Sequence, residues 1–152
     1  MADILSYSTI AEAQTYFDNY RLITDAWDDA TAAKQQKALN FATAMIDKLN
    51  YAGEKSDSAQ VNQFPRGSDT EVPTDIKEAD AELAYALLDG IDPDFEYENL
   101  REVSMGFASV RDSMSTKLLP QHVINGIPSI QAWDKLTPYF RDVSAINLMR
   151  IS

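Results

Sequence analysis

Apolar side chains recur at helical spacing in three stretches of the first 90 residues, and each stretch predicts an amphipathic helix. The first stretch begins after Ser8 and Thr9, either of which can cap a helix. Glu12 stands three residues after Thr9, where it completes a capping box. The inner face of this short helix is expected to carry Ile10, Ala13, Phe17 and Tyr20.

The second stretch has the clearest helical pattern. Asp28, Asp29 or Thr31 can serve as its N-cap, and Gly53 follows closely enough to serve the turn at its C-terminus. The Trp27 side chain, just before the helix, is expected to fold over its first turn. The apolar stripe of this helix comprises Ala38, Ala42, Met45 and Leu49, with Phe41 and Ile46 on its flanks.

The third stretch follows a corner in the chain, "QFPRGSDTEVPTDIKEA". Phe64 is held in an extended conformation because Pro65 follows it, and Gly67 supplies a turn. Together with Arg66 these residues form a structural turn, and Pro73 then suits the first position of a helix. The helix is expected to run to about Asp89, where Gly90 stops it, with an inner face of Ile76, Ala79, Leu83, Ala86 and Leu87.

The pattern changes after this third helix. Residues 103–110 have apolar side chains at every second position, which predicts a strand or an extended arm. A later segment has helical spacing and predicts one short helix, which Pro138 ends or kinks. The apolar positions of the two segments are Val103, Met105 and Phe107, and then Ile130, Trp133 and Leu136.

The sequence therefore predicts a mainly α fold, with a small bundle of about three main helices in residues 1–98 and an extended C-terminal arm in residues 99–152. A long stretch with so little regular structure is unusual inside a compact domain. The arm is accordingly expected to find its partners outside its own subunit. The alternative is that it wraps back over its own body.

Charge separates the same two parts. The chain has a net charge of −11 and a sequence pI near 4.3. Residues 1–100 hold 20 acidic and seven basic side chains, whereas residues 101–152 hold four and six. An acidic body repels nucleic acid phosphates. There are no cysteines, and no signal-peptide or membrane-spanning pattern is found, so we expect a soluble protein made in the cytoplasm.

No catalytic constellation emerges from the motifs. The corner has neither GxxxxGK[ST] nor GxGxxG, so Arg66 is expected to pair with a helix carboxylate rather than to hold a phosphate. His122, the only histidine, lies in an irregular segment without a GxSxG serine or further ligands. The acidic cluster near residues 89–98 lacks the central glycine of a calcium loop. We therefore expect no enzyme, cofactor or metal.

The residues from Trp27 to Gly90 resemble the head–tail connector or adaptor proteins of tailed bacteriophages. The matching features are "AWDDAT", "MIDKLNYAGEKSD", the "FPRG" turn and "VPTDIKEADAELAYALLDG". The resemblance implies a structural virion protein in the neck between capsid and tail, made in the host cytoplasm. It implies a homo-oligomeric ring, usually twelvefold, that docks on the portal protein and receives tail components. It also implies that genomic double-stranded DNA passes through the lumen of the ring without specific binding.

On this hypothesis the C-terminal arm docks on the portal or on neighbouring subunits. Its expected anchors are Trp133, Leu136, Tyr139, Phe140, Ile146, Leu148, Met149 and Ile151. Related sequences are also described as DnaT-like, which implies a single-stranded DNA-binding replication-type protein as the alternative function. The acidic charge argues against that alternative, because single-strand binding needs a positive groove. An enzyme ranks third.

Overall fold

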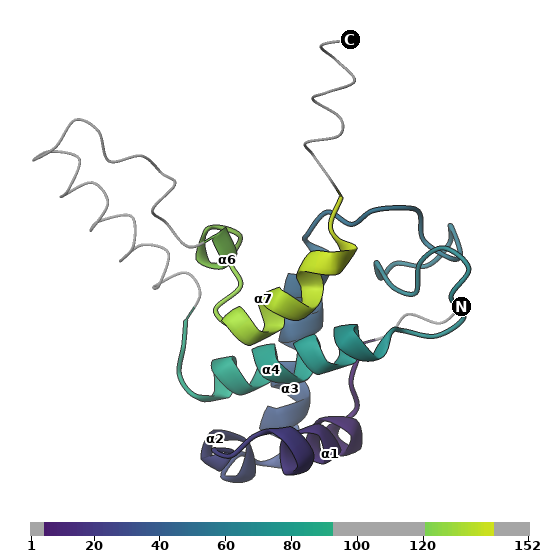
Figure 1. Cartoon of the computed structure of the whole chain (residues 1–152). Helices are drawn as coiled ribbons and strands as arrows, with labels where there is room; N and C mark the ends of the chain where they lie inside the picture. Colours follow the sequence, from purple (N-terminus) through teal and green to yellow (C-terminus); the bar gives the residue numbers. More distant parts are fainter. Residues whose placement is uncertain (1–4, 93–120, 142–152) are drawn as a thin grey trace, which may run out of the picture.

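The computed structural model describes residues 5–92 and 121–141, and the regular structure of these residues is helical (Figure 1). The predicted mainly α fold class is confirmed. Within the described residues, β pairing is limited to two isolated bridges, Tyr51 with Phe140 and Lys55 with Arg66. The helices are α1 (Ile10–Tyr20), α2 (Asp25–Asp28), α3 (Ala32–Asp47), α4 (Thr74–Leu88), α6 (Gln121–Ile124), α7 (Ile130–Leu136) and the 3₁₀ helix η2 (Thr137–Tyr139).

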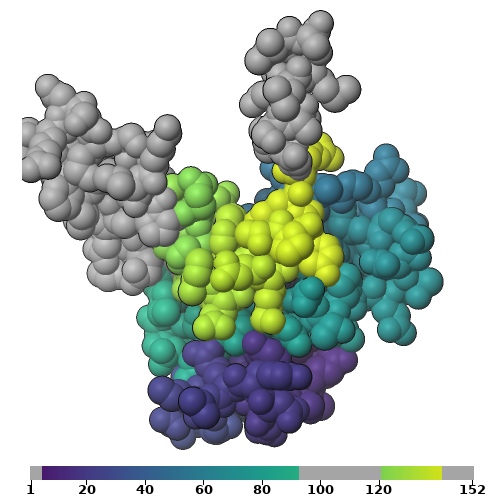
Figure 2. Space-filling model, in the orientation of Figure 1, coloured from purple at the N-terminus to yellow at the C-terminus, as the bar shows by residue number. Residues whose placement is uncertain are grey.

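Helix α4 lies at the centre of the molecule. It runs between α7 on one side and α1 and α2 on the other, while α3 lies behind it (Figure 1). In the space-filling view α7 covers α4 from above and the α1–α2 region closes it from below (Figure 2). Small side chains allow this close approach, and the fully or almost fully buried positions of α4 include Ala79, Ala81, Leu83, Ala84 and Ala86.

The ends of α4 are close to the prediction. The helix begins at Thr74, so Pro73 occupies the N-cap position rather than the first helical turn. Gly90, with φ at +91°, follows its C-terminal end, where a left-handed conformation favours glycine. The Ile91 amide donates to the Ala86 carbonyl at 3.2 Å, which closes the end of the helix. The positions of Pro73 and Gly90 in the sequence therefore predicted both ends of α4 to within one residue.

The predicted capping box of α1 is confirmed. Thr9 Oγ1 accepts a hydrogen bond from the Glu12 amide at 3.1 Å, and Glu12 Oε2 accepts one from the Thr9 amide at 3.0 Å. Ala13 and Phe17 are buried as expected. The assignment of Tyr20 to this inner face was wrong, because its ring lies along the surface against Tyr16 and its outer side stays exposed to solvent.

The region before α3 contains a short helix, α2, that the sequence pattern did not indicate. Trp27 on α2 is fully buried, as its predicted position over the next helix required. Its Nε1 donates to Gln14 Oε1 at 2.8 Å, and its carbonyl accepts from Gln35 Nε2 at 2.8 Å. Thr31 is the N-cap of α3, since its hydroxyl accepts from the Lys34 amide at 3.3 Å.

The predicted stripe of α3 is confirmed at Ala38, Ala42 and Met45, which are buried, but the buried face is wider than predicted. Leu39 and Thr43 are buried, whereas Phe41 is 54% exposed and does not flank the core. Helix α3 ends at Asp47, so Gly53 belongs to the following loop and not to the turn that closes the helix. The helical spacing of the apolar residues predicted the helix correctly. It did not determine which positions beside the stripe are covered by the neighbouring helices.

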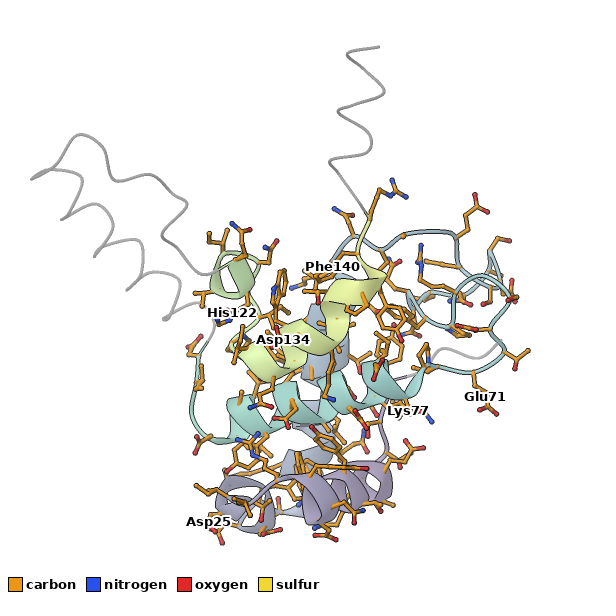
Figure 3. All side chains as sticks on the ribbon, in the orientation of Figure 1. Asp25, Glu71, Lys77, His122, Asp134 and Phe140 are labelled. Carbon is orange, nitrogen blue, oxygen red and sulfur yellow. The ribbon has the colours of Figure 1, made fainter. Side chains whose placement is uncertain are left out.

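Residues 121–141 pack on the helical body. The short helix α6 was not expected, whereas the short helix predicted around Trp133 is α7. Leu136 is fully buried, and the Trp133 and Phe140 rings pack together at 4.9 Å between centroids. Tyr139 packs against Phe64 at 5.6 Å (Phe140 is labelled in Figure 3). These four arm anchors thus lie in or against their own subunit's core.

The remaining arm predictions lie outside the described residues. They are the 103–110 strand, with Val103, Met105 and Phe107, and the anchors Ile146, Leu148, Met149 and Ile151. Among the helices that the structure describes, none combines the length and apolar composition needed to cross a bilayer.

Candidate functional site

The corner at residues 63–67 is held by the chain itself. The Phe64 amide donates to Tyr7 Oη at 3.2 Å, and the Gly67 amide donates to the Glu54 carbonyl at 2.8 Å. Phe64 and Pro65 are buried, and Gly67 has φ at +63°, a conformation that favours glycine. These amides have internal acceptors and are not offered to an anion. The corner is therefore held in place by contacts within the chain.

Arg66 has a different partner from the one predicted. Its guanidinium donates to the Ala52 and Gly53 carbonyls at 3.0 and 2.5 Å, and to the Gln63 carbonyl and side chain at 3.1 and 2.9 Å. The expected ion pair with a helix carboxylate is absent among the described residues. Carbonyl oxygens of the adjoining loop surround the fork-shaped guanidinium and satisfy its donors. Arg66 clamps two loop segments together.

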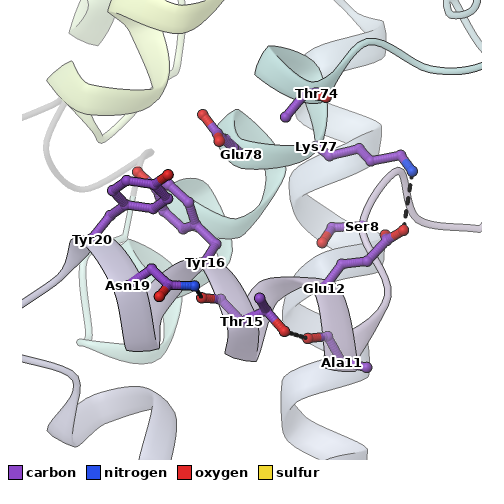
Figure 4. A pocket seen from close by; sticks show the side chains of 10 residues that line it. All are labelled: Ser8, Ala11, Glu12, Thr15, Tyr16, Asn19, Tyr20, Thr74, Lys77 and Glu78. Carbon is purple, nitrogen blue, oxygen red and sulfur yellow. Dashed lines mark hydrogen bonds and ion pairs between the residues drawn. The ribbon is translucent and has the colours of Figure 1, made fainter.

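A groove of about 520 Å³ lies between α1 and the beginning of α4 (Figure 4). Tyr16 and Tyr20 form one end of it, with ring centroids 5.5 Å apart. Glu12 and Lys77 form an ion pair at the other end, where Lys77 Nζ lies 3.0 Å from Glu12 Oε1. The groove combines apolar ring surface with a polar rim, which is the usual composition of a binding surface.

Two titratable groups of the groove, Tyr16 and Glu12, have pKa values that are shifted away from neutral pH. Burial raises the pKa of the Tyr16 phenol, and its hydrogen bond to Glu82 at 2.8 Å raises it further. Partial burial acts to raise the pKa of Glu12, but hydrogen bonds from Thr9 and Lys77 outweigh it and the net pKa is lowered. Tyr16 therefore stays neutral and Glu12 stays ionised, which suits the groove to binding rather than to acid–base catalysis.

Beside the groove, the link from α1 to α2 exposes three large apolar side chains. Tyr20 is 75% exposed, Ile23 is 68% exposed and Leu22 is completely exposed. We call these three residues the α1 edge. A single exposed leucine is ordinary, but a contiguous apolar group beside a groove is typical of a protein interaction site. Sequence analysis missed Leu22 and Ile23 because they lie between helices, where no periodic pattern marks them.

The buried Asp80 and the half-buried Asp47 connect the N-terminal segment to the rest of the protein. Asp80 on α4 accepts hydrogen bonds from the Ser8 amide at 3.0 Å and the Thr43 hydroxyl at 2.8 Å. Burial raises the pKa of Asp80 to about 7, although these hydrogen bonds act in the opposite direction. Asp47 accepts hydrogen bonds from the Tyr7 hydroxyl and from the Gln63 amide. Both carboxylates fix the N-terminal segment to the body.

The described residues are strongly acidic overall, with 17 acidic and nine basic side chains. Most of the basic side chains form ion pairs or hydrogen bonds within the protein. Arg21 pairs with Glu82 and lies over the Tyr85 ring, with its guanidinium carbon 3.7 Å from the ring centroid. Four further cations are held by carboxylates or by polar oxygens of the chain, namely Lys55, Arg66, Lys77 and Lys135. Few positive charges are left to attract an anionic ligand.

His122 has a local structural contact. Its Nδ1 donates to the Ile127 carbonyl at 2.8 Å, and the Ile127 amide donates to the His122 carbonyl at 2.7 Å. These two hydrogen bonds close the turn after α6. Within residues 5–92 and 121–141, no group of three or more side chains of the metal-binding types comes together.

Comparison with known proteins gives one family. The sequence model of that family matches residues 1–136, and the family is described as "Putative DnaT-like ssDNA binding protein". The matched span includes every helix from α1 to the end of α7. Neither the curated proteins nor the solved structures gave a match.

Proposed function

The chain belongs to the DnaT-like ssDNA binding protein family, and we propose, from its resemblance to the connector proteins and from its described surface, that it is a structural subunit, the head-to-tail adaptor of a tailed bacteriophage. In this role several copies form a ring, twelvefold in the connectors that the sequence resembles. The ring docks on the portal protein, extends the DNA channel and provides the platform for tail attachment. The protein then resides in the neck of the virion and performs no chemical reaction.

The observation that carries this proposal is the α1 edge. Leu22 is completely exposed and Ile23 is 68% exposed, on a protein whose described residues are acidic overall. Burying one such side chain in an interface contributes about 1.5–3 kcal/mol. The groove beside the edge adds ring surface and a polar rim that a neighbouring subunit can engage. Both features support association with another protein rather than catalysis.

The acidic surface supports the same role. A ring whose wall carries many carboxylates and few free cations repels phosphates. Genomic DNA can slide along such a wall, because no array of charged contacts has to break with each step. The net charge also keeps the free subunit soluble before assembly.

Native mass spectrometry of the chain with the portal protein of the same genome tests the proposal. We expect the chain to bind in one copy per portal subunit, or to form a ring that binds the portal. The matched variant lacks residues 142–152. This truncation leaves α7 intact and removes the anchors Ile146, Leu148, Met149 and Ile151. A chain that stays monomeric and unbound at all concentrations overturns the adaptor proposal.

Single-stranded DNA binding is the second candidate function. The observation that favours it is the family match, because the family model covers residues 1–136 and the family description names single-stranded DNA binding. The acidic surface opposes it and requires any such site to be local. Titration of a labelled oligonucleotide at two salt concentrations separates the candidates, because an adaptor binds the portal whether or not the oligonucleotide binds. Salt-dependent binding without portal binding favours the second candidate.

A further inference from the structure

The outward side of α3 differs from the rest of the described surface. Lys34, Lys37 and Lys48 are exposed there, and Phe41 and Ala44 lie between them. These five positions follow one another at intervals of three and four residues, so they form a single stripe along the helix. We call this stripe the α3 outer face. At about 1.5 Å per residue it extends about 21 Å from its first to its last lysine.

The lysine side chains of this face have no interaction partner among the described residues. Within residues 5–92 and 121–141, none of the three makes a hydrogen bond or an ion pair through its side chain. Five of the other six cations are bound to carboxylates or to polar oxygens of the chain. The sixth is Arg141, whose amide donates to the Asn50 carbonyl at 3.4 Å, two residues beyond Lys48. The free cations of the described surface therefore gather along α3 and at its C-terminal end.

The sequence keeps negative charge away from this face. Residues 31–46 contain no acidic side chain, although the described residues hold 17. The acidic residue at the end of α3, Asp47, is engaged by Tyr7, Asn62 and Gln63. The face is thus a positive strip on a negative protein. Phosphates that approach elsewhere are repelled, so an anionic polymer is directed to this strip.

Phe41 gives the strip a second property. Its ring is 54% exposed in the middle of the lysines, where nothing in the protein's own core requires an aromatic residue. Exposed aromatic rings flanked by cations are the usual platform for single-stranded nucleic acid, because unpaired bases stack on the ring while the phosphates contact the cations. A duplex hides its base faces and leaves such a ring without a partner.

We propose that the α3 outer face binds a segment of single-stranded DNA, with the phosphates on Lys34, Lys37 and Lys48 and a base stacked on Phe41. The inference goes beyond the adaptor role, and it gives the family's single-strand activity a location on this chain. Three phosphate contacts predict weak binding whose logarithm falls with the logarithm of salt concentration with a slope of about −2. Binding is therefore detectable at low salt and largely lost at physiological salt.

The test is fluorescence anisotropy of the full chain with a labelled oligothymidylate of about 16 nucleotides at low salt. The triple variant Lys34→Gln, Lys37→Gln, Lys48→Gln is expected to bind at least about ten-fold more weakly. Its control carries the same change in net charge on other elements, at exposed neutral positions, as Ser68→Asp, Thr70→Asp, Gln131→Glu. The control is expected to lose less than half as much binding free energy as the triple variant, because its charges are distant and screened.

The contribution of the ring is measured separately. Phe41→Ala is expected to weaken oligothymidylate binding about ten-fold, since stacking of one base contributes about 1–3 kcal/mol. It is expected to leave binding of a duplex of the same length within two-fold. Tyr20→Ala, at an exposed ring on α1, is the control and is expected to bind like wild type.

Three results overturn the inference: wild type that does not bind at low salt, a triple variant that matches its control, or a Phe41→Ala variant that binds like wild type. None of them affects the adaptor proposal, which depends on portal binding. Circular dichroism of each variant establishes that the fold is retained, as the exposure of all the altered side chains predicts.

Discussion

The α1 edge and the α3 outer face both expose aromatic rings, yet their surroundings differ. The groove beside the α1 edge is lined by Glu12 and Glu78, whose charges are paired with Lys77 and Lys135. The α3 outer face has three free lysines and no acidic residue within the helix before Asp47. Apolar exposure with neutralised charge suits a protein partner, whereas exposure with unpaired positive charge suits a polyanion. The two surfaces therefore differ more in whether their charged groups are paired than in their aromatic content.

The assignment of Phe41 to a surface rather than to the core is tested most directly by stability. Phe17→Ala is expected to lower the free energy of unfolding by about 3–5 kcal/mol, because its ring is fully buried against Trp27 and Tyr85. Phe41→Ala is expected to change it by less than about 1 kcal/mol. Urea denaturation of the two variants measures the difference. Equal losses mean that Phe41 is a core residue and that the α3 outer face is not a free surface.

The pH dependence of stability tests whether the two surfaces belong to one body. Asp80 joins the segment before α1 to α3 through Ser8 and Thr43. Its pKa of about 7 in the folded protein lies above the value of about 3.9 in an unfolded chain. The unfolded chain therefore loses this proton first, and stability falls as pH rises from about 4 to about 7. This contribution is at most about 4 kcal/mol.

Asp80→Asn removes the titrating group, so the variant is expected to gain stability relative to wild type as pH rises through that window. Thr43→Ala is the control, because it deletes one hydrogen bond but keeps the carboxyl group. Chemical denaturation at pH 5 and at pH 8 compares the three proteins. A difference between Asp80→Asn and wild type that is the same at both pH values contradicts the raised pKa.

Association of the protein tests the α1 edge. The double variant Leu22→Asp, Ile23→Asp is expected to weaken self-association or portal binding at least about thirty-fold, since charged groups then replace apolar contacts at the centre of an interface. Val61→Asp alters another exposed apolar side chain, in the loop before the corner, and is expected to have little effect. Sedimentation velocity over a range of concentrations measures both. An unchanged association for the double variant removes the α1 edge as an interface.

Much of the fold follows from the sequence, and the reasons are local. The Thr9 capping box, the Thr31 cap, Gly90 and the helical pattern of α4 act within a few residues of one another. Long-range packing decided the rest. Leu136 and Phe140 were predicted as arm anchors because they are apolar side chains that follow a long stretch with little regular structure, yet α7 covers α4 and brings them against the core.

The candidate surfaces were harder to predict than the helices. An apolar residue within a helical pattern is assigned to the core by default, and Tyr20, Phe41 and Ile130 are exceptions among the described residues. Whether a lysine is free or paired depends on contacts such as Lys77 with Glu12, 65 residues apart in the sequence. Sequence spacing does not contain that information. The acid-free stretch of residues 31–46 was nevertheless visible and gives the one signal that could have marked the α3 outer face.

The smallest effect concerns the pairing of the lysines themselves. Lys77→Ala is expected to lower the free energy of unfolding by about 0.5 kcal/mol, because it removes a solvent-exposed ion pair with Glu12. Lys34→Ala removes no partner among the described residues and is expected to change stability by less than that. A double-mutant cycle of Lys77→Ala with Glu12→Ala isolates the pair, and added salt should reduce its coupling energy. If Lys34→Ala lowers the free energy of unfolding as much as Lys77→Ala does, with the same salt sensitivity, Lys34 is already paired in the folded protein. The contrast between the paired charges beside the α1 edge and the free lysines of the α3 outer face then no longer holds.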